Sequence, residues 1–108
     1  MAATFTLRSA EATSGGRMRI EGTFVLDSSY VDTGEVIDLS AYFKSTSSPT
    51  VFVQARSSIY EYYHDGGTAV AGVIYAHVKA DASAAANSSN LAAVTGILVA
   101  FGQQVGTS

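Results

Sequence analysis

The sequence predicts an all-β fold, an antiparallel β-sandwich of the jelly-roll type with a short N-terminal arm. Apolar and polar side chains alternate with a period of two in several short runs, and turn-forming residues separate these runs. No run of about ten or more residues has a helical period. A chain of 108 residues, 47% hydrophobic and 14% charged, suits one folded domain. We therefore expect residues 1–16 to form an arm and a loop, and residues 17–108 to form a single β domain.

The first element is a short strand. Phe5 and Leu7 alternate with polar neighbours, which is the pattern of a half-buried strand. The small and polar residues 10–16 end in Gly15 and Gly16 and predict a loop.

The clearest alternation in the chain covers residues 17–26. Met18, Ile20 and Phe24 fall on one face, so this run predicts a strand with an apolar inner side. Gly22 falls in the same inward register, which indicates a bulge, a bend or the close approach of a neighbouring segment.

A loop excursion follows this strand. Asp and Ser in residues 27–29 and Asp32 before Gly34 supply turn chemistry. Within the excursion, Asp38 is placed to cap one helical turn that directs Leu39, Tyr42 and Phe43 toward the core.

The second half of the chain contains the remaining strands. β-Branched and aromatic residues predict them at residues 51–53, 59–63, 70–79 and 95–101. Residues 64–68 carry Asp65, Gly66 and Gly67 and predict a hairpin turn between the second and third of these strands. Residues 80–90 are rich in Ala, Ser and Asn and predict a surface loop.

Composition excludes several classes of partner. The net charge is −3 and the six basic residues are scattered, so we expect no nucleic-acid partner. The chain has no cysteine, which excludes disulfides and thiolate chemistry. The N-terminus does not resemble a secretory signal, and the apolar run at residues 91–101 is too short to cross a membrane. We expect no membrane association.

No motif in the chain indicates catalysis or a cofactor. A serine nucleophile needs a base, yet the only histidines are His64 beside a turn and His77 late in a strand, and no G-x-S-x-G motif is present. Antiparallel pairing across the turn at Asp65 could bring His64 and His77 onto neighbouring strands, but the spacing of these three residues is not diagnostic of a metal site. We expect no enzyme activity, no metal and no cofactor.

Four acidic residues crowd the loop excursion: Asp27, Asp32, Glu35 and Asp38. They lack the spacing of a calcium-binding loop, so we interpret them as turn formers and a helix cap.

Tyrosines gather on the two strands of the predicted hairpin. Tyr60 and Tyr62 share one face and Tyr63 lies on the other, with Tyr75 on the following strand. Such rings could form a platform for a sugar or another ligand, or they could pack in the core or at a subunit contact. A carbohydrate- or ligand-binding β module that uses exposed tyrosines therefore remains an alternative function.

The low charge content favours contact with other proteins. A small monomer usually keeps a charged surface, whereas much of this surface must consist of Ala, Ser, Thr and Gly. Small side chains lose little conformational entropy when they are buried.

The order of these segments resembles the capsid decoration, or cement, proteins of tailed bacteriophages. The resemblance is carried by the strand at residues 17–26 followed by the sequence DSSY, the turn at Thr33, Gly34 and Glu35, the residues from Asp38 to Phe43, the strand at residues 60–62, and the closing run at residues 97–102.

The resemblance implies a virion protein on the capsid exterior that bridges neighbouring major capsid subunits as a homodimer or homotrimer. The implied contact residues lie in the arm, at Phe5, Leu7 and Arg8, where strand addition to a partner sheet is physically reasonable. Tyr60 and Tyr62 complete the set of predicted partner-binding residues.

Overall fold

A computed structural model shows an all-β fold in which two antiparallel sheets pack face to face. The structure describes residues 3–13, 15–26, 34–80, 83, 91 and 94–105. The strands are β1 (Thr4–Thr13), β2 (Arg17–Val25), β3 (Glu35–Ile37), β4 (Thr50–Ala55), β5 (Tyr60–His64), β6 (Gly72–Val78) and β7 (Gly96–Gln103). The predicted β-sandwich is confirmed.

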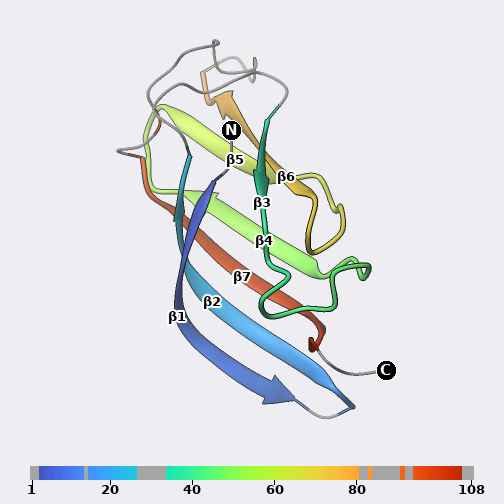
Figure 1. Cartoon of the computed structure of the whole chain (residues 1–108). Coiled ribbons are helices and arrows are strands. Elements are labelled where there is room, and N and C mark those ends of the chain that lie inside the picture. Colours follow the sequence, from blue (N-terminus) through green and yellow to red (C-terminus); the bar gives the residue numbers. More distant parts are fainter. Residues whose placement is uncertain are drawn as a thin grey trace.

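The larger sheet has the strand order β1-β2-β7-β4 and the smaller sheet has the order β3-β6-β5 (Figure 1). Strands β2, β3, β4 and β5 alternate between the two sheets, while β7 lies between β2 and β4 and β6 lies between β3 and β5. In both sheets, a strand from late in the chain is thus inserted between two earlier ones.

The core lies between the sheets and is built from the inward side of each alternating strand. Ile20, Phe24, Leu98 and Ala100 come from the larger sheet and are almost completely buried. The predicted turn after Asp38 adds to this core: Ser40 N donates to Asp38 Oδ1 at 2.9 Å, and the Tyr42 and Phe43 amides both donate to Leu39 O at 3.0 Å. Leu39 and Phe43 are buried as expected.

The β1–β2 hairpin differs from the prediction. The sequence predicts a loop from Ala10, but β1 runs on to Thr13 and pairs with β2 along its length. The turn itself is short and uses Gly15 and Gly16, whose φ angles of 77° and 71° suit glycine. This half of the strand consists of small and polar residues. It is a strand because it pairs with β2, and an alternation of apolar residues was therefore not needed.

Gly22 shows the close approach that its inward position predicted. A side-chain Cβ at Gly22 would collide with the carbonyl oxygen of Thr6 and with the ring of Phe5 on β1. The irregularity of this hairpin lies on the partner strand, where Arg8 is the extra residue between Leu7, opposite Gly22, and Ser9, opposite Glu21. The absence of a side chain at Gly22 therefore leaves room for the Thr6 carbonyl and the Phe5 ring of the neighbouring strand.

Strands β3 and β6 also differ from the sequence predictions. Strand β3 lies where only a loop was expected, and its pairing with β6 explains why three residues suffice. Strand β6 begins at Gly72 instead of Val70, because Ala71 N and Gly72 N both donate to Thr68 O and extend the turn. The turn predicted at residues 27–29 and most of the loop predicted at residues 80–90 lie outside the described residues.

Candidate functional site

The outward side of the larger sheet carries a group of apolar side chains at its centre. We call this group the aromatic face; it consists of Phe52 on β4, Ile97, Val99 and Phe101 on β7, and Arg19 on β2. The register explains why they meet, since Phe52 is paired with Val99, and Phe101 is paired with Arg19. Val53, Leu98 and Ala100, their neighbours along the strands, point inward and pack in the core. Since side chains alternate between the two faces of a strand, Phe52, Val99 and Phe101 point outward.

Phe52 is the most exposed large apolar side chain of the described residues, with 61% of its surface accessible, and Phe101 is 36% accessible. Their ring centroids are 6.4 Å apart with an interplanar angle of 81°, an edge-to-face pair. The guanidinium carbon of Arg19 lies 5.9 Å from the Phe101 ring centroid, within the range of a cation–π contact. The aromatic face is therefore pre-arranged by contacts among its own residues.

Charged residues border the aromatic face toward β1. Arg19 Nη2 lies 3.9 Å from Glu21 Oε2, a long and partly exposed ion pair that contributes little stability. Glu11 on β1 is paired with Arg19 on β2, so side chains of opposite charge lie beside each other on the two strands. An apolar centre with a polar border is the arrangement found at protein–protein contacts.

The predicted arm residues belong to β1, an edge strand of the larger sheet. Leu7 is 38% accessible and Arg8 is exposed at the bulge, so both are available to a partner. Phe5 is half-buried and packs edge to face on Tyr42 with 5.9 Å between centroids. The structure thus places Leu7 and Arg8 at an open edge and places Phe5 against the core.

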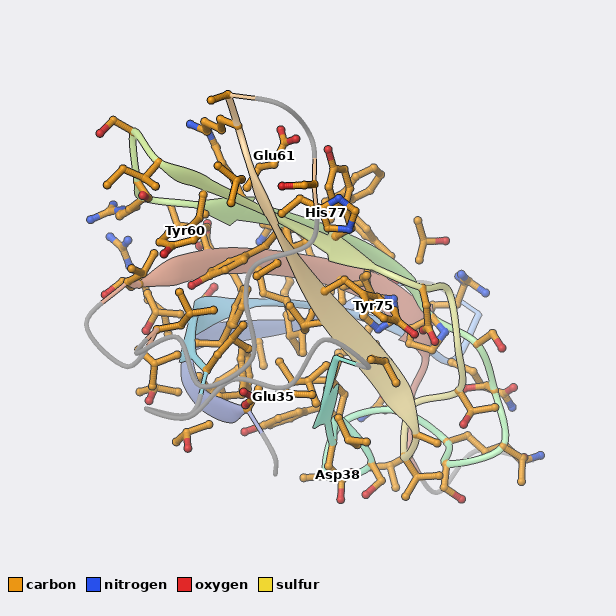
Figure 2. The ribbon with its side chains drawn as sticks, turned by 90° about the horizontal axis from the view of Figure 1, so that it is seen from above. Glu35, Asp38, Tyr60, Glu61, Tyr75 and His77 are labelled. Atoms are coloured by element: carbon orange, nitrogen blue, oxygen red, sulfur yellow. The ribbon has the colours of Figure 1, made fainter. Side chains whose placement is uncertain are left out.

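The predicted tyrosines Tyr60 and Tyr62 point inward. Tyr62 is only 4% accessible, its ring lies 5.3 Å from that of Phe24, and its hydroxyl donates to Val94 O at 3.1 Å. Tyr60 is half-buried and packs against the core, between β5 and β7 in Figure 2. The expectation that Tyr62 could be exposed is therefore wrong. Its side chain lies on the inward side of the small sheet, because residues of one strand alternate between the two faces.

The opposite side of β5 and β6 exposes a different aromatic group. Tyr63 is 46% accessible and its ring lies 5.1 Å from the imidazole of His77, edge to face. A hydrogen bond with Glu61, together with desolvation and the negative charge of that carboxylate, raises the pKa of Tyr63. Figure 2 shows Glu61 and His77 on the side of the small sheet that faces away from β7.

The two histidines lie on neighbouring strands but on opposite faces. His64 follows the inward parity of Tyr62, whereas His77 follows the outward parity of Tyr75. Among the residues that the structure describes, no group of three His, Asp or Glu side chains is placed to hold a metal ion. The hairpin therefore does not bring His64, Asp65 and His77 into one ligand set.

Asp65 and His64 organise the turn between β5 and β6. Asp65 Oδ1 accepts from Gly67 N at 2.8 Å and from Val73 N at 3.1 Å, and His64 Nδ1 accepts from Gly66 N at 3.0 Å. Burial lowers the pKa of His64, and the neighbouring Asp65 charge opposes this only in part. Burial raises the pKa of Asp65, but its backbone donors and His64 outweigh burial, so the net pKa is lowered.

Glu35 is the one acidic side chain of the described residues that is fully buried. It lies on β3 opposite Ile74 and takes part in an interaction within the fold. Asp38 instead caps the turn at Ser40, as predicted, and its hydrogen bonds with Ser40 lower its pKa. Asp27 and Asp32 lie outside the described residues.

The sequence pattern missed the aromatic face for an identifiable reason. In β7 both parities are apolar, because Leu98 and Ala100 alternate with Val99 and Phe101. When both faces of a strand are apolar, the alternation of side chains does not predict which face is buried and which is exposed. A signal was nevertheless available in residue size, since Gly96, Ala100 and Gly102 fit a crowded interior and the bulkier residues alternate with them.

Among the described residues, no helix is long and apolar enough to span a membrane. The part of the chain that the structure describes forms no pocket, and the surfaces of its strands are open sheet faces and edges. Searches of the chain against protein-family models, curated proteins and solved structures find no match.

Proposed function

We propose that this chain is a structural protein of a virus particle. It binds the outer surface of a phage capsid and stabilises the shell by bridging neighbouring major capsid subunits, acting as a homodimer or homotrimer. The observation that carries the proposal is the aromatic face, on which Phe52 and Phe101 stand side by side and accessible on an open sheet.

The chemistry of the aromatic face suits a protein partner. Aromatic and arginine side chains contribute most of the binding energy at many protein contacts, especially near the centre of the contact and behind a polar border. Phe52 and Phe101 supply the aromatic centre, and Arg19 lies over Phe101. An open sheet face of this kind can lie on a broad protein surface.

The shell setting comes from the resemblance to capsid decoration proteins and from composition. With 14% charged residues, the chain offers much small and polar surface that costs little entropy to bury. Repetition of one modest contact over a shell, through a protein with several binding faces, multiplies its effect.

The test is binding to capsids of the phage that encodes this chain, assembled without it. Purified chain should sediment with the capsids and raise the temperature at which they open. Phe52→Ser and Phe101→Ser should each weaken binding at least about tenfold, the scale of an interface hot spot. Ile59→Ser is the matched control, because Ile59 is 58% accessible but lies outside the aromatic face.

Two results would contradict the proposal. Wild-type chain that stays in the supernatant at all concentrations would exclude capsid binding. Equal losses from Phe52→Ser and Ile59→Ser would show that any exposed apolar residue contributes, and that the aromatic face is not the contact.

The ligand-binding alternative now rests on different tyrosines from those that the sequence indicated. Tyr63 is exposed, is oriented by Glu61 and His77, and lies on an outward sheet face with Tyr75. Aromatic rings held flat on such a face can stack on a sugar. A glycan array would favour this function if it shows binding that Tyr63→Ala removes and Ile59→Ala does not.

A further inference from the structure

Strand β1 has one side without a neighbouring strand in the described sheets. Its other side is paired with β2, and it stands at the end of the order β1-β2-β7-β4. Just before β1, Ala3 N donates to Val36 O of the smaller sheet at 2.8 Å. From Thr6 to Thr13 every residue is exposed. The backbone groups along such an edge are able to pair with a further strand.

The charges on β1 have a fixed relationship to those on β2. The bulge at Arg8 and Ser9 lies opposite Glu21, and Glu11 lies opposite Arg19. Ser9, Glu11, Arg19 and Glu21 belong to the outward register of the larger sheet, whereas Leu7, Ala10 and Ala12 belong to the inward register. A strand that pairs well with β1 therefore needs an acidic residue opposite the bulge and a basic residue opposite Glu11.

A second copy of β1 meets both needs when it runs antiparallel about a two-fold axis. If Ala10 lies opposite Ala10 of the second copy, the bulge at Arg8 and Ser9 faces Glu11 of the other strand, in both directions. Leu7 then faces Ala12, and Thr6 faces Thr13. Each pair keeps inward residues with inward residues, because the two bulges occupy equivalent places on either side of the axis.

The neighbouring registers are electrostatically poor. An axis at Glu11 would place two carboxylates directly opposite each other, and an axis at Ser9 would bring the two Arg8 bulges together. A two-fold axis perpendicular to the sheet exchanges the two strands but keeps each side chain on the same face of the sheet. Directly opposite residues share a face, so the axis must pass between two copies of the same residue. Of these three registers, charge and symmetry therefore favour the axis at Ala10.

We propose that two copies of this chain pair through β1 with Ala10 on the two-fold axis. The two larger sheets then form one continuous sheet, and both aromatic faces lie on the same side of it. This inference deepens the proposed function, on which its biological setting rests, by naming the oligomer and the self-association edge. The pairing itself involves no capsid and is measurable on the purified protein.

Cysteine substitution tests the register directly, because the chain contains no cysteine of its own. Paired residues of antiparallel strands have Cα atoms about 4.5 to 5.5 Å apart, which a disulfide can span. Mild oxidation should therefore convert Ala10→Cys largely to a covalent dimer. Thr13→Cys is the matched control: it is equally exposed, and the register separates the two copies of that position by roughly 20 Å.

Charge exchange gives a second and independent test. Arg8→Glu and Glu11→Arg should each weaken the dimer at least about tenfold in analytical ultracentrifugation, since each places like charges across the axis. The double variant Arg8→Glu with Glu11→Arg should recover most of the wild-type affinity. It retains the unfavourable pairs with Glu21 and Arg19 inside the chain, so recovery must come from pairing between copies.

A wild-type chain that is monomeric or trimeric at high concentration would overturn the inference. So would equal cross-linking of Ala10→Cys and Thr13→Cys, or a double variant weaker than both single variants. Lys44→Glu, an exposed charge reversal away from β1, should leave the mass unchanged. A dimer that does not bind capsids would refute the proposed function and leave this inference standing, and capsid binding by a trimer would do the reverse.

Discussion

The hydroxyl of Tyr62 on β5 donates a hydrogen bond to the carbonyl oxygen of Val94, 3.1 Å away and just before β7. This bond connects the small sheet with the segment that enters the large sheet. The same ring packs 5.3 Å from Phe24 of β2. Tyr62 is thus a structural link between the layers, although its sequence context suggested a surface role.

Replacement of Tyr62 should lower the free energy of unfolding. Tyr62→Phe removes the hydroxyl and leaves the Val94 carbonyl without that donor, at a cost of about 1 kcal/mol. Tyr62→Ala also leaves a cavity beside Phe24 and should cost about 3 to 5 kcal/mol. Urea denaturation followed by tyrosine fluorescence would measure both values. Tyr63→Ala is the control, and a large loss of stability there would contradict the placement of Tyr63 on the surface.

Gly22→Ala should destabilise the β1–β2 hairpin. The added methyl group would meet the Thr6 carbonyl oxygen and the Phe5 ring, and a backbone atom of a paired strand cannot move away easily. Overpacking of this kind typically costs about 1 to 3 kcal/mol. Thr23→Ala, the next residue on the opposite face, should change stability much less. Equal thermal midpoints for the two variants would show that β1 is not held close to β2.

Deletion of Arg8 should leave the pairing of β1 with β2 in register. Arg8 is the extra residue of the bulge, so its removal brings Leu7, opposite Gly22, directly next to Ser9, opposite Glu21, and leaves a regular ladder. Phe5 therefore keeps its contact with Tyr42. We expect the unfolding midpoint of the deletion variant to stay close to that of Arg8→Ala, as chemical denaturation of both variants would show. A loss of about 2 kcal/mol in the deletion variant alone, the scale of exposing the Phe5 side chain, would contradict the assignment of Arg8 as the extra residue.

Stability should fall as the pH drops below neutrality because of His64. Its pKa is lowered in the folded chain by burial, whereas the unfolded chain has a pKa near the ordinary value of 6.5. The unfolded state therefore binds a proton first, and the stabilisation present above about pH 6.5 is lost as the pH falls toward the folded-state pKa. Protonation also places a hydrogen on Nδ1, the atom that accepts from Gly66 N, and so removes that hydrogen bond.

Unfolding free energies at a series of pH values would test this. His64→Gln should flatten the decline that begins below about pH 6.5, whereas His77→Gln should retain it. A second decline at lower pH belongs to Asp65, whose pKa is depressed below 3.8, so that its contribution is present above that value and is lost as the pH falls further. A wild-type curve that is flat between pH 7.5 and the region of Asp65 would refute the role of His64.

The parts of the fold that the sequence predicted well are those in which one face of a strand is apolar and the other is polar. Met18, Ile20 and Phe24 alternate with charged residues, and β2 lies where this pattern placed it. The turn at Asp65 was equally clear, because Asp and Gly supply its hydrogen bonds and conformations locally. These signals are local and independent of the rest of the chain.

The parts that the sequence did not predict depend on partners distant along the chain. The second half of β1 is a strand because β2 lies beside it, and β3 is a strand because Val36 lies opposite Val73. Neither segment has a strong pattern of its own. The candidate contact surface was missed for the related reason that β7 is apolar on both faces, so that only its pairing with β4 and β2 shows which side is open.

The position of β7 has a consequence for how the chain acquires its structure. β7 follows all the other described strands in sequence, yet it separates β2 from β4 in the larger sheet, so Ile20 has no partner on that side until Ala100 arrives. Partly folded chains therefore have an unpaired apolar strand, which makes them prone to aggregation. Contacts between such distant residues slow the search for the native arrangement to milliseconds or longer. The larger sheet is therefore completed late and at its middle, when β7 pairs with β2 and β4.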